Sequence, residues 1–261
     1  MHDRLPAVAG MFYPQDPEDL RATVNQYLQS DDKSARLPKA LIVPHAGYIY
    51  SGSVAGTAYA SLAAGRDTIK RVVLMGPSHR VPLIGLATCS AEHFLTPLGT
   101  VKVDRDSIAA LQKYPQVHNM DEAHALEHSL EVQLPFLQMM LSDFELIPIV
   151  VGDSSIEDVS AILEELWGGD ETLIVISSDL SHYHDYKTAQ QMDARTSEAI
   201  ETLSPEKIQY DDACGRNPVR GLLQIARQRH YHVKTLDLRN SGDTAGPRDQ
   251  VVGYGAYLFY Q

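Results

Sequence analysis

Four short apolar runs, separated by segments long enough to form helices, constrain the fold of this chain most strongly. Each run has four to seven residues and lacks the alternation of a half-exposed strand, a pattern typical of strands buried on both faces. Such strands alternate with helices in units that set them parallel in one sheet, with helices on both faces. We therefore predict an α/β fold with a central, mainly parallel sheet. The runs are Ala40–Val43, Arg71–Met75, Glu145–Val151 and Thr172–Ser177.

Between and after these runs, apolar residues recur at helical spacing or alternate as in strands. A cap by Ser154 or Ser155 is expected before the helix that separates the last two runs. The predicted helices are 17–29, Ser53–Leu62, Asp106–Tyr114, His128–Met140, Ile156–Trp167, Ala189–Leu203 and a helix near Asn217–Arg229. The further predicted strands are Leu83–Cys89, Thr100–Val103, Val233–Arg239 and Gly253–Phe259.

Composition limits the class of protein further. The 261 residues contain no repeat and no Gly/Ser-rich linker, so one domain over residues 1–261 is predicted. The formal charge of −12 argues against a nucleic-acid scaffold. No apolar run approaches the roughly 20 residues that cross a bilayer, so no membrane association is expected. Two cysteines make no disulfide framework, which favours a cytoplasmic location.

Three of the apolar runs end in a polar turn that contains histidine. Ala40–Val43 leads to His45, Arg71–Met75 leads to His79, and the last run leads to Asp179 and His182. In open α/β sheets, ligands bind beyond the carboxyl ends of the strands. If the strands are parallel, these side chains converge at one edge of the sheet, and we predict a functional site there.

Imidazole is the commonest neutral metal ligand, and two imidazoles suit iron, copper or zinc. A third, anionic ligand would balance the charge of the ion. The residues alone leave this ligand open among Cys214, Asp179, Glu127 and Glu131. Cys89 follows an apolar strand and is expected only to pack in the core.

The segment around His128 holds a second group of candidate residues. His124 and His128 are four positions apart with Glu127 between them, but the acid is misplaced for the HExxH zinc motif. We expect His128 and Glu127 to point into the site from the start of a helix, and His124 to face solvent or cap a loop. Arg216 and Arg80 could supply positive charge for an anionic substrate, although such arginines are more often solvated.

Several long motifs occur in order along nearly the whole chain. They are RLPAVAGMFYP from Arg4, then PHAGYIYSG, GPSH, EHSLEVQLPFL, SSDLSHY, ACGR and GYGAYL. Together these motifs resemble the Memo family, whose prokaryotic members are known as AmmeMemoRadiSam system protein B. The family is similar in fold to class III extradiol ring-cleavage dioxygenases, which implies a three-layer α/β/α sandwich.

The resemblance also implies roles for individual residues. A cysteine stands where the dioxygenases have a carboxylate ligand, and this softer ligand is compatible with iron(II) and also favours copper(I) or zinc. Iron(II) is the expected metal, with copper or zinc as alternatives. The implied metal ligands are His45, His79 and Cys214; His182 is the implied acid/base, and Asp179 and His128 line the same pocket.

Three functions remain open at this stage. The first is a metal-dependent oxidoreductase acting on an unknown small substrate. The second is a non-catalytic module that binds a peptide or small ligand on a dioxygenase-like scaffold. The third is a zinc hydrolase with Glu127 as general base. The resemblance further implies AMMECR1-like and radical-SAM proteins as partners.

Overall fold

The computed structural model describes residues 3–29 and 36–261. Its centre is formed by four parallel strands in the order β8, β3, β9, β2. All their residues are buried except Arg71 and Glu145, the first residues of β3 and β8. Their registers place Val43 beside Ser177 and Pro77 beside Val151, so the carboxyl ends lie at one edge of the sheet. The four apolar runs were therefore predicted correctly. The strands are β2 (Ala40–Val43), β3 (Arg71–Pro77), β8 (Glu145–Val151) and β9 (Thr172–Ser177).

Further strands extend this core into a mixed sheet of twelve among the described residues. On one side β12 (Val251–Tyr260) runs antiparallel to β2, and β11 (His232–Asn240) and β10 (His182–His184) both pair with β12. On the other side β6 (Gly99–Val103) is parallel to β8. The remaining strands at that side are β1 (Asp3–Arg4), β5 (His93–Thr96), β4 (Leu86–Thr88) and β7 (Val117–Asn119).

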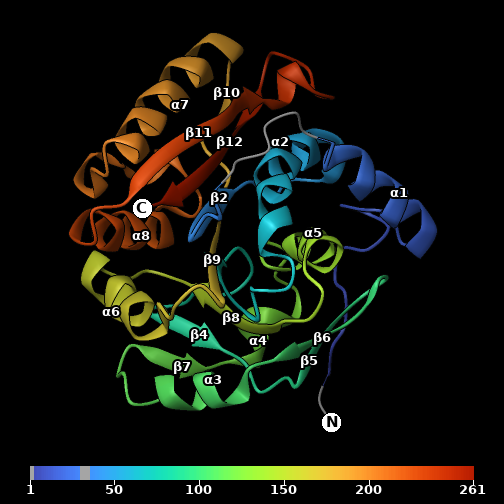
Figure 1. The fold of residues 1–261 in the computed structure, drawn as a ribbon. Coiled ribbons are helices and arrows are strands. Elements are labelled where there is room, and N and C mark those ends of the chain that lie inside the picture. The colour runs from blue at the N-terminus through green and yellow to red at the C-terminus, as the bar shows by residue number, and fades with distance from the viewer. Residues whose placement is uncertain (1–2, 30–35) are drawn as a thin grey trace.

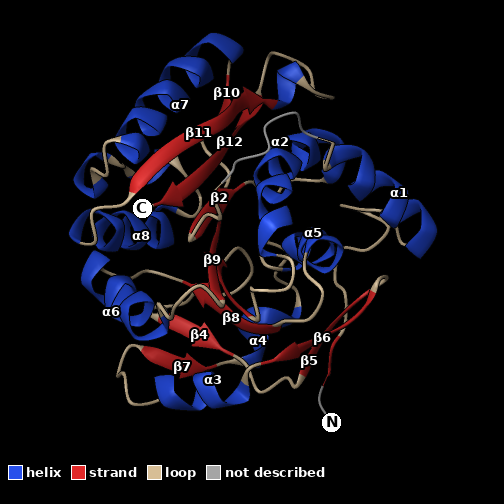
Figure 2. Cartoon of the chain, in the orientation of Figure 1, coloured by secondary structure: helices blue, strands red, loops and turns tan. Residues whose placement is uncertain are grey.

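Helices cover both faces of the sheet, which gives the three-layer α/β/α arrangement (Figures 1 and 2). One layer contains α1 (Pro17–Tyr27), α2 (Tyr48–Ala60) and α5 (Leu134–Met140). The other contains α6 (Ile156–Leu166), α7 (Tyr186–Glu201) and α8 (Arg216–Gln228). The short helices α3 (Arg105–Leu111) and α4 (Asp121–Ala125) lie against the β8 and β4 end of the sheet. Among the described residues, no helix has the length and apolarity that spanning a membrane would need.

Local sequence explains where α6 begins and which face it buries. Ser155 caps the helix through the backbone N–H of Asp158, and the Asp158 side chain accepts from the Ser155 N–H. This reciprocal pair satisfies two amides that the first helical turn leaves free. Val159, Ile162 and Leu163 form the buried stripe of the helix. The predicted cap and amphipathic pattern are thus both observed.

The helix predicted over His128–Met140 is wrong in its first part. The structure has a 3₁₀ turn at Glu131–Gln133 and begins α5 only at Leu134. Pro135 explains the break, because it has no N–H to donate to a preceding carbonyl and is tolerated only in the first turn of a helix. Residues 126–130 are left irregular, and this irregular backbone carries His128.

The other predicted helices and strands differ from the structure in where they begin or end. Helix α2 begins at Tyr48 instead of Ser53, and β12 runs from Val251 to Tyr260 instead of Gly253 to Phe259. The remaining predicted elements, except Leu83–Cys89, differ by a few residues at each end, where the hydrophobic pattern is least decisive. Of Leu83–Cys89, only Leu86–Thr88 is strand.

His124 does not face solvent as predicted. The side chain is 2% exposed, and its Nε2 donates to the carbonyl of Ala87 at 2.9 Å, while Nδ1 is buried without a hydrogen-bond partner among the described residues. Burial lowers the pKa of His124 from its ordinary value of 6.5 to about 4. The folded protein therefore holds this imidazole neutral.

The depressed pKa of His124 predicts a loss of stability in mild acid. In the unfolded chain the imidazole takes up a proton as the pH falls through about 6.5, whereas the folded protein resists until about pH 4. The free energy of unfolding should fall across this window, by up to about 3 kcal/mol from this group. Urea unfolding of His124→Gln, whose amide can still donate to Ala87, should show a shallower decline between pH 6.5 and 4 than the unsubstituted protein. An equal decline in both would contradict the assignment.

Candidate functional site

Three imidazoles meet at the carboxyl edge of the parallel strands. His45 follows β2, His79 follows β3, and His128 comes from the irregular segment between α4 and α5. Each offers one ring nitrogen, and these three atoms lie within 4.8 Å of one another. The ring centroids are 4.7 to 5.5 Å apart. The parallel strand ends predict that His45 and His79 converge. His128, which does not follow a strand, completes the group of three.

Cys214 and Asp179 both contact His45. Cys214 comes from the loop before α8, and its Sγ is 3.3 Å from His45 Nε2 and accepts from the Asp179 N–H at 3.3 Å. The Asp179 carboxylate accepts from the His45 N–H at 2.7 Å, and its second oxygen is 4.0 Å from His45 Nε2. The thiol, the carboxylate and the imidazoles therefore share one small volume.

These groups line a cavity of about 690 Å³. His182, at the start of β10, lines it too, so all six residues singled out from the sequence face one cavity. Aromatic side chains form much of the remaining wall, and the Phe12 ring packs 4.8 Å from that of His128. The aromatic residues are Phe12, Tyr50, Tyr183 and Tyr254.

A chain of hydrogen bonds fixes the tautomer of His45. The Ser177 hydroxyl donates its single proton to the Ser129 carbonyl at 2.6 Å, and it lies 2.9 Å from His45 Nδ1. It must therefore accept from His45, so Nδ1 carries the proton and Nε2 presents its lone pair. Gln133 also donates to Ser177 Oγ at 2.8 Å, and Tyr59 donates to the Gln133 oxygen at 2.9 Å.

Glu127 plays the corresponding part for His79. Its carboxylate is buried and accepts from the His79 N–H at 2.6 Å, from His79 Nδ1 at 2.8 Å and from the Ser129 N–H at 2.9 Å. The hydrogen bonds from His79 hold the pKa of Glu127 down, at about 2, against the opposing effect of burial. The anionic acceptor leaves His79 Nε2 free to face the cavity.

Burial favours the neutral forms of four groups at the site. It lowers the pKa of His45 and of His128, and the neighbouring His79 lowers both further. Burial also raises the pKa of the Cys214 thiol and of Asp179. The lone pairs of the His45 and His128 imidazoles are therefore favoured for binding a ligand.

The donor set fits a transition metal ion. Histidines that bind metals usually give their second ring N–H to a carboxylate or another acceptor, as His45 and His79 do here. The buried Nδ1 of His128 makes no hydrogen bond among the described residues and lies 3.5 Å from Glu127 Oε1. Nitrogen donors beside a thiol are the set that iron, copper and zinc accept, whereas magnesium and calcium require oxygen.

Two residues weighed in the sequence analysis lie outside this site, one of them as expected. Glu131, weighed as the anionic ligand, is fully buried and binds Arg4, two backbone amides and Tyr13 instead. Cys89 is 1% exposed and packs in the core, as predicted. Sequence reasoning missed Ser177 and Gln133, although Ser177 is the last residue of a strand that points at the site.

The fold and this edge of the sheet define the class as a three-layer α/β protein with a histidine-rich cavity beyond its strand ends. The chain belongs to the Memo family, because the sequence model of Memo-like proteins matches residues 4–258. A MEMO1 family protein of Aquifex aeolicus is 38% identical, over 99% of this chain and 100% of the relative. One from Saccharolobus islandicus is 34% identical over 98% and 99%.

A solved structure supports the fold. The crystal structure of an uncharacterized protein from Escherichia coli K12 superposes with a TM-score of 0.51 at 12% identity, covering 85% of this chain and 100% of the other. At this identity the likeness concerns architecture alone. It is consistent with the α/β/α sandwich that the sequence motifs implied.

Proposed function

We propose that this protein is a metal-dependent oxidoreductase, with iron(II) as the first candidate ion and copper or zinc as alternatives. His45 and His79 hold the metal, Cys214 is the anionic third ligand, and His128 stands beside the ion. The observation that carries the proposal is the group of three imidazole nitrogens within 4.8 Å of one another. A bound redox-active metal would supply electron transfer and an open coordination position to the substrate.

The chain's own residues would orient the substrate and move its protons. His182 and Asp179 border the same cavity as the three imidazoles, which suits the proton-transfer role implied for His182. The aromatic wall offers apolar surface to the substrate beside the imidazoles. The substrate is a small molecule, since the cavity volume is about 690 Å³.

The hydrolase alternative loses support from the position of Glu127. Both of its oxygens already accept hydrogen bonds from His79, and its side chain is 1% exposed. A general base must reach the proton that it removes, and this carboxylate is turned to the back of His79.

Two further proposals concern partners and location. The AMMECR1-like and radical-SAM partners rest on the family resemblance. The cytoplasmic location rests on the two cysteines, which make no disulfide framework.

Metal binding tests the proposal directly. Anaerobically reconstituted protein should bind about one metal ion per chain, because one set of donors surrounds one point. The double variant His45→Ala/Cys214→Ser should lose this binding. A matched control, His232→Ala/Cys89→Ser, removes the same two residue types away from the cavity and should keep it. Equal binding in the two double variants would exclude the site, and a metal-free protein that binds an acidic peptide in the cavity would favour a non-catalytic binding module.

Cobalt(II) substitution tests the choice of third ligand. If Cys214 binds the ion, the cobalt protein should show a thiolate-to-metal charge-transfer band that Cys214→Ser abolishes and His128→Asn retains. If the three imidazoles alone hold the ion, the band is absent and His128→Asn weakens binding the most. Both outcomes are read from the absorption spectrum and from the metal content of the same samples.

A further inference from the structure

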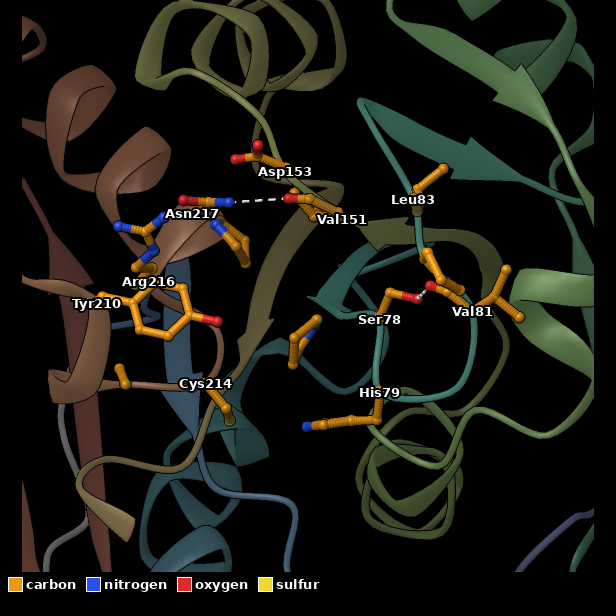
Figure 3. A pocket seen from close by; sticks show the side chains of 15 residues that line it. Ser78, His79, Val81, Leu83, Val151, Asp153, Tyr210, Cys214, Arg216 and Asn217 are labelled. Carbon is orange, nitrogen blue, oxygen red and sulfur yellow. Dashed lines mark hydrogen bonds between the residues drawn. The ribbon is translucent and has the colours of Figure 1, made fainter.

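A second cavity opens on the opposite side of His79 and Cys214. It has a volume of about 560 Å³ and shares these two residues with the first cavity. Its walls come from the segment after β3, from the end of β8 and from the start of α8 (Figure 3). A ligand that enters it therefore reaches two members of the histidine and cysteine group from a direction that the first cavity does not use.

Arg216, the first residue of α8, lines this second cavity. Its guanidinium lies over the ring of Tyr210, 4.8 Å from the centroid, and among the described residues no carboxylate is within ion-pair distance. Elsewhere on α8, Arg227 pairs with Glu206, and Arg220 donates to the Pro205 carbonyl at 3.0 Å. Arg229, just beyond the helix, pairs with Glu164. In a chain of net charge −12, an arginine held at a cavity wall without an acid is available to an anionic ligand.

Neighbouring groups add to the attraction. The hydroxyl of Tyr210 points into the cavity in Figure 3. Helix α8 has 13 residues and no side-chain cap, and the positive end of its dipole lies at this wall. Of its first three positions, only Asn217 has an available backbone N–H, because the Arg216 N–H donates to the Ala213 carbonyl and Pro218 has no N–H. The Asn217 side chain donates to the Gly152 carbonyl at 2.8 Å, and its buried oxygen has no hydrogen-bond partner among the described residues.

Asp153 is the one acid among the described residues that line the cavity, and it limits where an anion can bind. It lies at the end of the cavity away from His79 and Cys214 (Figure 3). Together with the unpaired Asn217 oxygen it provides acceptors for a hydroxyl or amine, and it repels a second anionic group. The cavity thus suits a ligand with one anionic group and a hydrogen-bond donor next to it.

We propose that the second cavity binds the carboxylate or phosphate group of the substrate through Arg216 and Tyr210, so that the rest of the molecule passes Cys214 and His79 to reach the three imidazoles. The placement of the substrate's reacting end rests on the proposed function, whereas the anion site is argued from Arg216 and its neighbours. A guanidinium and a hydroxyl, together with the Asn217 N–H, recognise either oxyanion by charge-assisted hydrogen bonds. The two sources differ in charge and in the number of acceptor oxygens, and separate titrations distinguish them.

The test is a titration of metal-depleted protein with inorganic phosphate and, separately, with acetate, at constant ionic strength. Arginine Nε–Hε signals in NMR spectra report which guanidinium responds. We expect saturable binding of at least one anion and a loss of about tenfold or more in affinity in Arg216→Gln, the usual size of a charge-assisted contact. The control Arg227→Gln removes the same charge from the same helix outside the cavity and should bind as the unsubstituted protein does.

The outcomes separate this inference from the proposed function. No saturable binding, or equal affinity in Arg216→Gln and Arg227→Gln, overturns the anion site. Metal content is measured on the same preparations before depletion. If the unsubstituted protein and both variants bind metal but Arg216→Gln does not weaken anion binding, the anion site is refuted and the proposed function is retained. Anion binding through Arg216 in a protein that binds no metal supports the anion site and refutes the proposed function.

Discussion

Glu131→Ala is expected to lower the free energy of unfolding by about 3–5 kcal/mol, the usual cost of leaving a buried charge without its partner. The Glu131 side chain is fully buried and forms an ion pair with the equally buried Arg4. It also accepts from the N–H groups of Ala7 at 2.7 Å and Val8 at 3.0 Å, and from the Tyr13 hydroxyl at 2.5 Å. Alanine would remove the acceptor of the Arg4 guanidinium, the two amides and the Tyr13 hydroxyl at the same time.

Denaturant unfolding monitored by circular dichroism measures this effect. The matched control is Glu165→Ala, which breaks an ion pair of 2.8 Å with Lys113 at the surface. Exposed pairs contribute little, so the control should change stability by less than about 1 kcal/mol. The double variant Arg4→Met/Glu131→Met, which removes both charges, should recover part of the loss. Equal effects of Glu131→Ala and Glu165→Ala would contradict the role given to the buried pair.

The consequence of Glu131→Ala should extend to the site. Glu131 ties down residues 7, 8 and 13, and Phe12 of the same segment packs against His128 and lines the cavity. Loosening this segment removes one wall of the cavity and a contact that holds His128. We therefore expect any bound metal to be held more weakly in Glu131→Ala, whereas Glu165→Ala should not affect it.

The sheet core could be predicted because its strands are buried on both faces and so carry continuous apolar runs. Strands such as β1 and β7 could not, since they have two and three residues and exist only through their partners in the sheet. Their sequences hold no pattern of their own, and tertiary contacts override weak local preference.

The site, too, has residues whose positions could be predicted from the sequence and residues whose positions could not. The positions of His45 and His79 follow from strand ends, which is information that the chain carries locally. The role of Glu131 depends on Arg4, which is 127 positions away, so a carboxylate near histidines was read as a candidate ligand. The burial of His124, which is predicted to face solvent or cap a loop, could not be predicted for a similar reason, because the Ala87 carbonyl that accepts its hydrogen bond lies on a strand 37 positions away.

Ser177→Ala is expected to lower metal affinity by about 10–100-fold, the usual effect of removing a hydrogen-bond partner of a ligating histidine. The Ser177 hydroxyl accepts from His45 Nδ1, which keeps the lone pair on Nε2. Without it the buried Nδ1–H loses its acceptor, and the ring gains access to the other tautomer and to other orientations. Competition with a chelator measures the affinity, and nitrogen chemical shifts of the imidazole report the tautomer.

Ser160→Ala is the matched control, because Ser160 is also a buried serine that donates to a backbone carbonyl, at Ile156, but lies on α6 outside the cavity. It should leave both the metal affinity and the His45 tautomer unchanged. A purely structural role for Ser177 would lower the melting temperature while the metal affinity stayed the same, and that result would refute the positioning role. A loss of affinity with a changed tautomer would instead show that two neighbouring strands build this ligand together. The second residue after β2 is the ligand, and the last residue of β9 is the acceptor that sets which nitrogen of the ligand faces the cavity.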